Sequence, residues 1–153
     1  MANTYSQIYL QFVFAVQSRQ SLIAKVYKEE LHKYITALTQ ARKAKMLAVH
    51  CMPDHIHLLV GFPPAVLISD FVKQIKVESN EFINQKNWIK GKFSWKEGYG
   101  VFSYSHSQIP QVCQYIFRQE QHHKKTTFKQ EYFEFLEKFD VPFEERYLFE
   151  WIE

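Results

Sequence analysis

Features that mark specialised protein classes are scarce in this chain of 153 residues. Its two cysteines, Cys51 and Cys113, lack the spacing of a metal site or a disulfide framework, which favours a reducing cytoplasm. With four glycines and five prolines, collagen-like and low-complexity chains are excluded. No window approaches the roughly 18 apolar residues of a membrane span, and residues 1–14 do not read as a signal peptide. We therefore expect one cytoplasmic domain over residues 1–153, without a membrane partner.

Charge is unevenly distributed along the chain, although the net charge is only +3. Residues 71–129 carry 10 basic and 4 acidic side chains, a net +6, and residues 130–153 carry 2 basic and 8 acidic ones, a net −6. A basic segment favours a polyanionic partner, because Lys and Arg release counterions when they contact phosphates. We expect the acidic segment 130–153, a helix and a tail, to lie outside that contact.

Apolar periodicity indicates how the chain is organised. It predicts strands in residues 5–16, 46–52, 55–61 and 101–105. It predicts helices in residues 22–44, about 69–86, 110–123 and 127–139. The resulting order is β-α-β-β-α-β followed by further helical residues. That order predicts an α+β fold of the ferredoxin-like or RRM-like type, with a four-stranded antiparallel sheet, helices on one face and extra C-terminal helices.

Two histidines open the predicted strand 55–61 directly after the turn dipeptide Pro53-Asp54. Because side chains alternate across a strand, His55 and His57 share one face, and the apolar residues between and after them share the other. Imidazoles at positions i and i+2 can converge on one metal ion. An ordinary polar sheet face is the more common reason for a bare His-x-His pair.

A possible nucleophile lies on the predicted helix 110–123. At about 100° per residue, Tyr115, Gln119 and His122 fall on a seam beside the apolar stripe, with Tyr115 and Gln119 one turn apart. The seam therefore offers a phenol beside a neutral oxygen ligand. The alternative interpretation is a boundary tyrosine and a solvated glutamine.

Taken together, the two motifs resemble a known family. The stretch Met52–Val60, MPDHIHLLV, resembles the HUH signature of the single-tyrosine transposases of small insertion sequences. The stretch Tyr115–His123, YIFRQEQHH, resembles the same family's tyrosine helix, and Trp95–Gly100, WKEGYG, is similar to the segment before its last strand. The resemblance extends over residues 5–123 and implies the ferredoxin-like sheet that the strand order also predicts.

The resemblance implies a reaction and a division of roles. Tyr115 would attack a phosphodiester of single-stranded DNA, form a 5′-phosphotyrosine link and release a 3′-hydroxyl. The metal ligands would be His55, His57 and Gln119, which are all neutral and suit Mg²⁺ or Mn²⁺. The alternative metal is zinc, with extra ligands from His106, His122 or Asp54.

Several positions are candidates for contact with DNA. In residues 86–96 lysines alternate with aromatic residues, a pattern that single-strand-binding proteins use for phosphates and stacked bases. The alternative is that these aromatic rings hold the loop against the core. The predicted DNA-binding residues are Lys86, Trp88, Lys90, Lys92, Trp95, Lys124 and Lys125.

The family resemblance further implies a DNA hairpin as partner and a homodimer in which the tyrosine helix can serve the partner's His pair. Candidate hinges for such an exchange are residues 105–107 and 124–127. Two other functions fit the sequence: a non-catalytic, RRM-like module that binds single strands, and a domesticated HUH nuclease acting on host repeats. A metal site distinguishes the module from the enzyme, and the genomic flanks distinguish a mobile element from a domesticated one.

Overall fold

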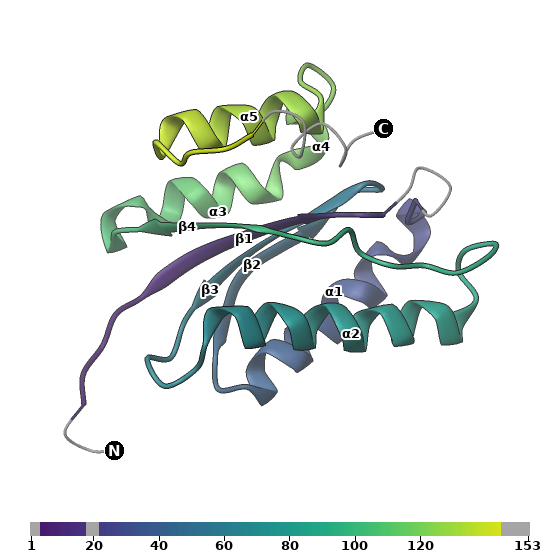
Figure 1. Ribbon diagram of the computed structural model, residues 1–153, viewed down its shortest axis with the longest axis horizontal. Helices are drawn as coiled ribbons and strands as arrows, with labels where there is room; N and C mark the ends of the chain where they lie inside the picture. Colours follow the sequence, from purple (N-terminus) through teal and green to yellow (C-terminus); the bar gives the residue numbers. More distant parts are fainter. Residues whose placement is uncertain (1–3, 18–21, 145–153) are drawn as a thin grey trace.

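The computed structural model describes residues 4–17 and 22–144. The strands are β1 (Tyr9–Ala15), β2 (Lys45–Cys51), β3 (His55–Gly61) and β4 (Gly100–Tyr104). The helices are α1 (Lys28–Ala41), α2 (Ile68–Lys86), α3 (Ile109–Phe117), α4 (Gln119–His122) and α5 (Phe128–Lys138), with the short 3₁₀ helices η2 (Lys25–Tyr27) and η3 (His106–Gln108). Figure 1 shows α1 and α2 on one side of the sheet and the C-terminal helices on the other.

The four strands form one antiparallel sheet in the order β2-β3-β1-β4. This is the split β-α-β arrangement, in which β1 and β3 are central. The register places Val13 opposite His57 and Ala15 opposite His55. The predicted ferredoxin-like fold is confirmed, and it puts the two histidines at the start of a central strand.

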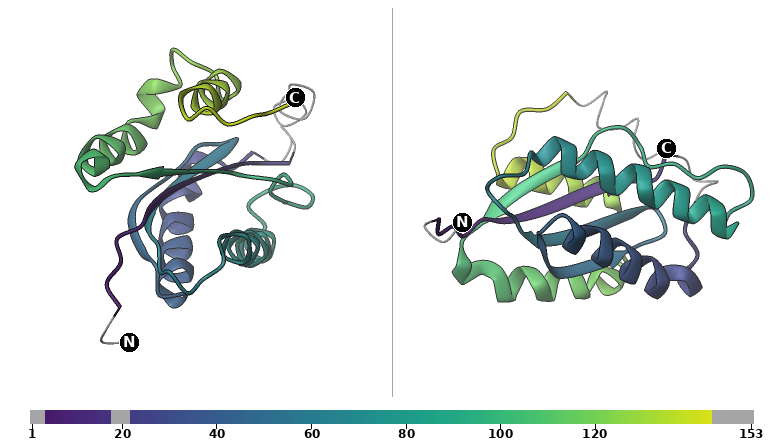
Figure 2. Two further views of the ribbon diagram at one scale, coloured as in Figure 1. Left: turned by 60° about the vertical axis from the view of Figure 1, so that its left-hand side comes forward. Right: turned by 90° about the horizontal axis from the view of Figure 1, so that it is seen from below.

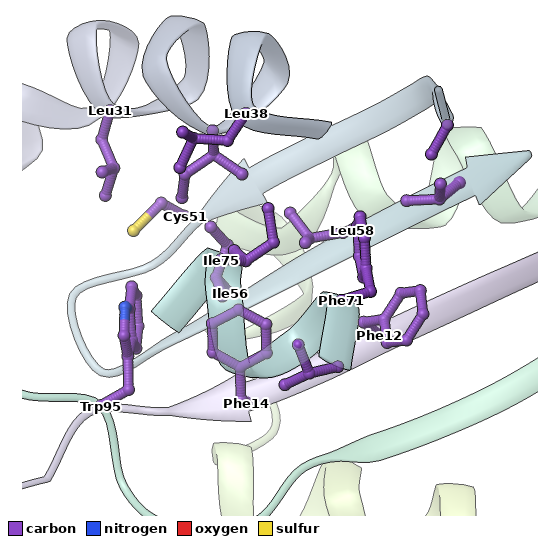
Figure 3. Close-up of a cluster of buried hydrophobic side chains, with 14 of the residues drawn as sticks. Phe12, Phe14, Leu31, Leu38, Cys51, Ile56, Leu58, Phe71, Ile75 and Trp95 are labelled. Atoms are coloured by element: carbon purple, nitrogen blue, oxygen red, sulfur yellow. The ribbon is translucent and has the colours of Figure 1, made fainter. Parts of the chain in front are cut away.

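The main hydrophobic core lies between the sheet and the helices α1 and α2. Phe12 and Phe14 of β1 point into it together with Ile56 and Leu58 of β3, and all four are at most 1% exposed. Figure 3 shows these side chains in one cluster with Phe71 and Ile75 of α2 and Leu31 of α1. Since alternate residues of a strand point to opposite faces, the same pattern turns the histidines toward the other face.

The extra C-terminal helices cover that second face. Val13 and Ala15 pack against Phe128, Phe135 and other side chains of α5, and Leu59 packs against Val112 and Ile116 of α3. The left view in Figure 2 shows helices on both sides of the sheet. In an RRM-like module one sheet face stays open for bases. Here α3, α4 and α5 cover the corresponding face.

Two element boundaries differ from the sequence prediction. The single helix expected over residues 110–123 is wrong, because α3 ends at Phe117 and α4 begins at Gln119. The chain leaves helical geometry at Arg118, with φ −99° and ψ 21°. The first helix begins at Lys28, after η2, and not at residue 22. In residues 4–17 and 22–144 no helix has the length and apolar character to cross a membrane.

Candidate functional site

A tight turn brings the two histidines to the start of β3. The backbone N–H of Met52 donates to the carbonyl of His55 over 2.8 Å, which closes the turn around Pro53 and Asp54. The next residues enter the sheet at once, so His55 and His57 face α3, α4 and α5, where they are 1% and 0% exposed. The Nε2 atoms of both rings point toward side chains of these helices.

Each histidine is held through its Nδ1 atom. Nδ1 of His55 lies 2.7 Å from Oδ1 of Asp54, and Nδ1 of His57 lies 2.8 Å from Nε2 of Gln11. The side-chain oxygen of Gln11, Oε1, in turn accepts a hydrogen bond of 2.7 Å from the hydroxyl of Tyr104. Metal-binding histidines in proteins have such a partner on the ring nitrogen away from the ion, because it fixes the orientation of the ring.

The predicted nucleophile, Tyr115 on α3, and the predicted ligand, Gln119 on α4, both lie beside the two histidines. The Oε1 atom of Gln119 lies 3.2 Å from Nε2 of His55, and the Gln119 side chain is fully buried. The ring of Tyr115 packs edge-on against His57 with the centroids 5.9 Å apart. An ion pair between Lys28 of α1 and Glu120 ties α4 to the rest of the molecule. Thus the structure brings His55, His57, Tyr115 and Gln119 together.

The centre of this cluster is a residue that the sequence analysis did not select, Glu131 of α5. Its Oε1 atom lies 3.1 Å from Nε2 of His57 and 3.0 Å from Nε2 of His123. Its Oε2 atom accepts hydrogen bonds from the Tyr115 hydroxyl and, at 3.0 Å, from the Gln119 amide. The side chain is 1% exposed. The acidic segment that we expected to lie apart from DNA therefore places one carboxylate inside the candidate site.

The sequence did contain a signal for Glu131. It falls three residues after Phe128 and four before Phe135, so it lies on the buried stripe of α5. A charged residue within an apolar stripe is rarely buried without partners. No local pattern, however, shows which surface that stripe will cover.

Burial and hydrogen bonding set the charges in the site. Burial lowers the pKa of His57, which keeps its imidazole neutral and able to bind a metal ion. Burial would raise the pKa of Glu131, but hydrogen bonds from His123 and His57 outweigh it and hold this pKa well below its usual range. Burial, and then the charge of Glu131, raises the pKa of Tyr115 well above its usual range. The phenol therefore needs nearby positive charge to act as a nucleophile at neutral pH.

The donor set fits a divalent metal ion. One ligand atom from each of His55, His57 and Glu131 lies within 4.8 Å of the other two, and all three residues are buried. With metal–ligand bonds of about 2.1 Å, ligand atoms at right angles lie about 3 Å apart. The distances of 3.1 Å from His57 to Glu131 and 3.2 Å from His55 to Gln119 match that spacing.

The zinc alternative receives only partial support. The ring of His106 contacts Tyr9, 3.2 Å from its hydroxyl, at the end of β1 away from His55. Asp54 is engaged with the outer nitrogen of His55. His122 is the proposed extra ligand that lies beside the cluster with its ring nitrogen directed at it, since its Nε2 atom is 3.5 Å from the Glu131 carboxylate.

Two hollows give access to Tyr115 from solvent. A cleft of about 250 Å³ between α3 and α5 is lined by Tyr115, Glu131, Phe135 and other residues. A wider groove of about 540 Å³ runs over α3 and α4 past Tyr115, and Arg118, His122 and Lys125 line it together with three glutamines. The groove offers cations and amide groups near the phenol.

Most of the predicted DNA-binding residues lie elsewhere. The aromatic residues of segment 86–96 pack with the α1 and α2 side of the sheet, opposite the histidines. Lys86 forms an ion pair with Glu30, and Trp88 stacks on Tyr27 with the centroids 4.6 Å apart. Lys124 and Lys125 are exposed directly after α4, on the same side as Tyr115.

Trp95 is a core residue in this fold. It is 5% exposed, its ring packs edge-on against Phe14 and Phe93, and its indole N–H donates to Ser79 over 2.8 Å. This burial argues against the predicted stacking of a base on Trp95. Its aromatic character instead serves packing, because a large ring fills the core where β1 ends.

We expect Trp95→Ala to lower the free energy of unfolding by about 3–5 kcal/mol, because it leaves a large cavity and removes the hydrogen bond from the indole N–H to Ser79. Urea unfolding followed by circular dichroism measures the change. Exposed Lys90 in the same segment provides the control, and Lys90→Ala should stay within about 0.5 kcal/mol of wild type. A Trp95→Ala protein as stable as wild type would mean that the ring is free for another role.

Comparisons with known proteins agree with this architecture. The family profile described as "Transposase IS200 like" matches residues 4–119. The ISDra2 transposase TnpA of Deinococcus radiodurans is 25% identical over 124 residues, covering 78% of this chain and 87% of that protein. The transposase for insertion sequence element IS200 of Salmonella typhimurium is 24% identical over 106 residues, covering 66% of this chain and 70% of that protein.

Solved structures show the same relationship. A crystal structure described as a transposase from Deinococcus radiodurans R1 superposes with a TM-score of 0.58 at 25% identity, covering 76% of this chain and 94% of that one. A REP-associated tyrosine transposase bound to a REP hairpin has the same fold, with a TM-score of 0.60 at 17% identity over 79% of this chain and 72% of that one.

The antiparallel sheet, with its buried histidine pair and neighbouring tyrosine, defines a protein of the single-tyrosine transposase class. The chain belongs to the IS200-like transposase family. The predicted resemblance is thereby confirmed, and α5, which follows the matched residues, lies beyond the segment that the family profile describes.

Proposed function

We propose that this protein is a metal-dependent DNA transposase that cleaves and rejoins single-stranded DNA through a 5′-phosphotyrosine intermediate. One observation carries the proposal: Tyr115 and Gln119, from the C-terminal half of the chain, meet the paired histidines of β3 in one buried site. A chance assembly of polar surface residues would not be buried together in this way, since buried polar groups are costly unless they are paired.

In the proposed reaction, His55, His57 and Gln119 hold a Mg²⁺ or Mn²⁺ ion. When bound, the ion polarises the scissile phosphate and stabilises the negative charge that develops during attack. The two histidines are oriented for this task by Asp54 and Gln11 through their Nδ1 atoms. The Nδ1–H of His55 donates to Asp54, which leaves the lone pair of Nε2 for the ion. His57 would offer its own Nε2 lone pair once the Gln11 amide turns to accept from Nδ1.

Tyr115 acts as the nucleophile. Its oxygen forms a bond to the phosphorus as the bond to the 3′ oxygen breaks; the phenol loses a proton and the leaving 3′ oxygen gains one. The covalent link keeps the energy of the phosphodiester, so attack by another 3′-hydroxyl reseals DNA without ATP. The cleft between α3 and α5 offers a path for a strand to Tyr115.

DNA is the proposed partner, in single-stranded form with a hairpin. Support comes from the REP-associated relative, whose structure contains a REP hairpin, and from the basic groove beside Tyr115. The proposed contacts are Lys124 and Lys125, which follow α4. The family relationship also supports the proposed homodimer with exchange of the tyrosine helix.

The decisive experiment is to trap the covalent product. Purified protein is incubated with a single-stranded oligonucleotide carrying the hairpin, with Mn²⁺ or with excess chelator. We expect a denaturant-resistant protein–DNA adduct only when the metal is present. An adduct of equal yield in chelator would refute metal dependence, and the lack of an adduct on any single-stranded end of the flanking DNA would favour a binding module.

We further expect the double variant Lys124→Ala/Lys125→Ala to weaken binding to hairpin DNA and to flatten its salt dependence. For each phosphate that the protein no longer neutralises, the slope of log K against log salt should fall by about 0.7 for a single strand. Fluorescence anisotropy across a salt series measures the slope.

The matched control is Lys90→Ala/Lys92→Ala, which removes the same charge from segment 86–96. We expect its salt slope to equal that of wild type. If this second pair changes the slope and the first does not, DNA binds along segment 86–96 instead of beside Tyr115.

A further inference from the structure

We infer that Glu131 is a fourth protein ligand of the metal ion, supplied by α5 from outside the segment that defines the family. This inference rests on the proposed function, because it concerns the ion that His55, His57 and Gln119 would hold. It changes the chemistry of the site, since one ligand carries a negative charge where the other three are neutral.

Position is the first argument. The Oε1 atom of Glu131 lies 3.1 Å from Nε2 of His57 and 3.6 Å from Nε2 of His55. These are separations expected between atoms that bind the same ion, for which bonds of about 2.1 Å place neighbouring ligands about 3 Å apart. The Gln119 oxygen is 3.2 Å from Nε2 of His55. Each of the four ligand atoms thus lies within 3.6 Å of at least one other, and they come from three separate elements, β3, α4 and α5.

Charge is the second argument. An ionised carboxylate that is 1% exposed needs compensation, because burying an isolated charge costs far more than burying a neutral group. The partners that surround Glu131 are four histidines, one amide and one phenol. A divalent cation between Glu131 and the β3 histidines would supply the compensating charge.

The hydrogen-bond network is compatible with this arrangement. As it stands, Gln11 donates to Nδ1 of His57, so Nε2 of His57 carries the hydrogen and donates to Glu131. A rotated Gln11 amide would accept from Nδ1 instead, and the Tyr104 hydroxyl can accept as readily as it donates. The Nε2 lone pair then becomes available to an ion at the place where the proton now lies.

The second carboxylate oxygen gives the ligand a further effect. Oε2 of Glu131 accepts from the Tyr115 hydroxyl while Oε1 faces the histidines. With Oε1 on the ion, the carboxylate would link the metal to the phenol and fix the phenol's direction. Phe128 adds rigidity, because its ring stacks on His55 with the centroids 4.0 Å apart and holds the start of α5 against the site.

The test is a Mn²⁺ titration of the full-length protein, in which free Mn²⁺ is measured by electron paramagnetic resonance. Glu131→Gln conserves size and removes the charge, and we expect it to weaken Mn²⁺ binding at least tenfold. The control is Glu137→Gln, the same change at an exposed position of the same helix, which should bind within twofold of wild type. If α5 instead merely covers the site and its carboxylate competes with the ion, Glu131→Gln will bind Mn²⁺ as tightly as wild type or more tightly, and the inference is overturned.

Two further variants make the outcome unambiguous. Wild type that binds no more Mn²⁺ than His57→Ala would overturn the metal-dependent function and this inference with it. A His57-dependent site that is unaffected by Glu131→Gln would overturn the inference alone. If thermal melting shows that Glu131→Gln does not fold, Glu131→Asp replaces it, since it keeps the charge but shortens the side chain. A loss of threefold or more then supports the inference, and a smaller change contradicts it.

Discussion

Replacing Tyr115 with phenylalanine is expected to abolish the covalent adduct with single-stranded DNA. The substitution removes one oxygen and conserves the ring, which packs against His57 and Phe135. The protein should fold, since removing the hydrogen bond to the Glu131 carboxylate costs at most about 3 kcal/mol. Binding to hairpin DNA should remain within a few-fold of wild type, because phosphate contacts dominate affinity. Gel analysis under denaturing conditions measures the adduct.

The control for this variant is Tyr9→Phe. Tyr9 also carries a hydrogen-bonded hydroxyl, to His106, but lies at the end of β1 remote from His55. We expect full adduct yield from it. Mass spectrometry of the wild-type adduct should place the DNA on Tyr115, and DNA on another tyrosine, or an adduct that persists in Tyr115→Phe, would show that the nucleophile is a different residue.

Replacing His57 with alanine should have the second large effect. The variant lacks one ring nitrogen of the proposed metal site, so we expect cleavage to fall by about 10²–10³-fold and Mn²⁺ binding to be abolished. DNA binding should persist. A cleavage assay over a series of Mn²⁺ concentrations, with and without chelator, measures the effect, and adding Mn²⁺ after chelation should restore wild-type activity but not that of the variant.

His106→Ala provides the comparison for a histidine outside the cluster. Its side chain reaches Tyr9 from η3, and we expect cleavage equal to wild type. Unimpaired cleavage by His57→Ala would refute the assignment of the metal site. A failure of His106→Ala to cleave would revive the zinc alternative in which that residue is a ligand.

The inferred role of Glu131 changes how the nucleophile would be activated. Three neutral ligands leave the full double charge of the ion facing the phosphate, whereas a carboxylate lowers it by one. Burial, and then this same carboxylate, raises the pKa of Tyr115, which opposes formation of the phenolate. A divalent ion bound to Glu131 would lower the pKa of the nearby phenol again, because its positive charge favours the phenolate. The site would then combine weaker attraction for phosphate with a better-placed nucleophile.

The sequence alone determined the sheet and the face on which the site lies. Side chains alternate between the two faces of a strand, so in HIHLLV His55 and His57 lie on one side and Ile56 and Leu58 on the other. The spacing of Tyr115 and Gln119 brought both to the same side of the chain even though the helix breaks at Arg118. These features are local, so periodicity was enough to predict them.

The tertiary structure alone decided which surfaces those local elements cover. The sequence analysis did not select Glu131, although it lies on the apolar stripe of α5, because only the packing of α5 across the sheet puts it beside His57. The sequence allowed two roles for the aromatic residues of segment 86–96, stacking on DNA bases or packing in the core. Trp95 packs against Phe14 in the core. A local pattern records that a face is apolar but not what covers it. That choice depends on contacts between residues far apart in the sequence, whose energies exist only once the chain has folded.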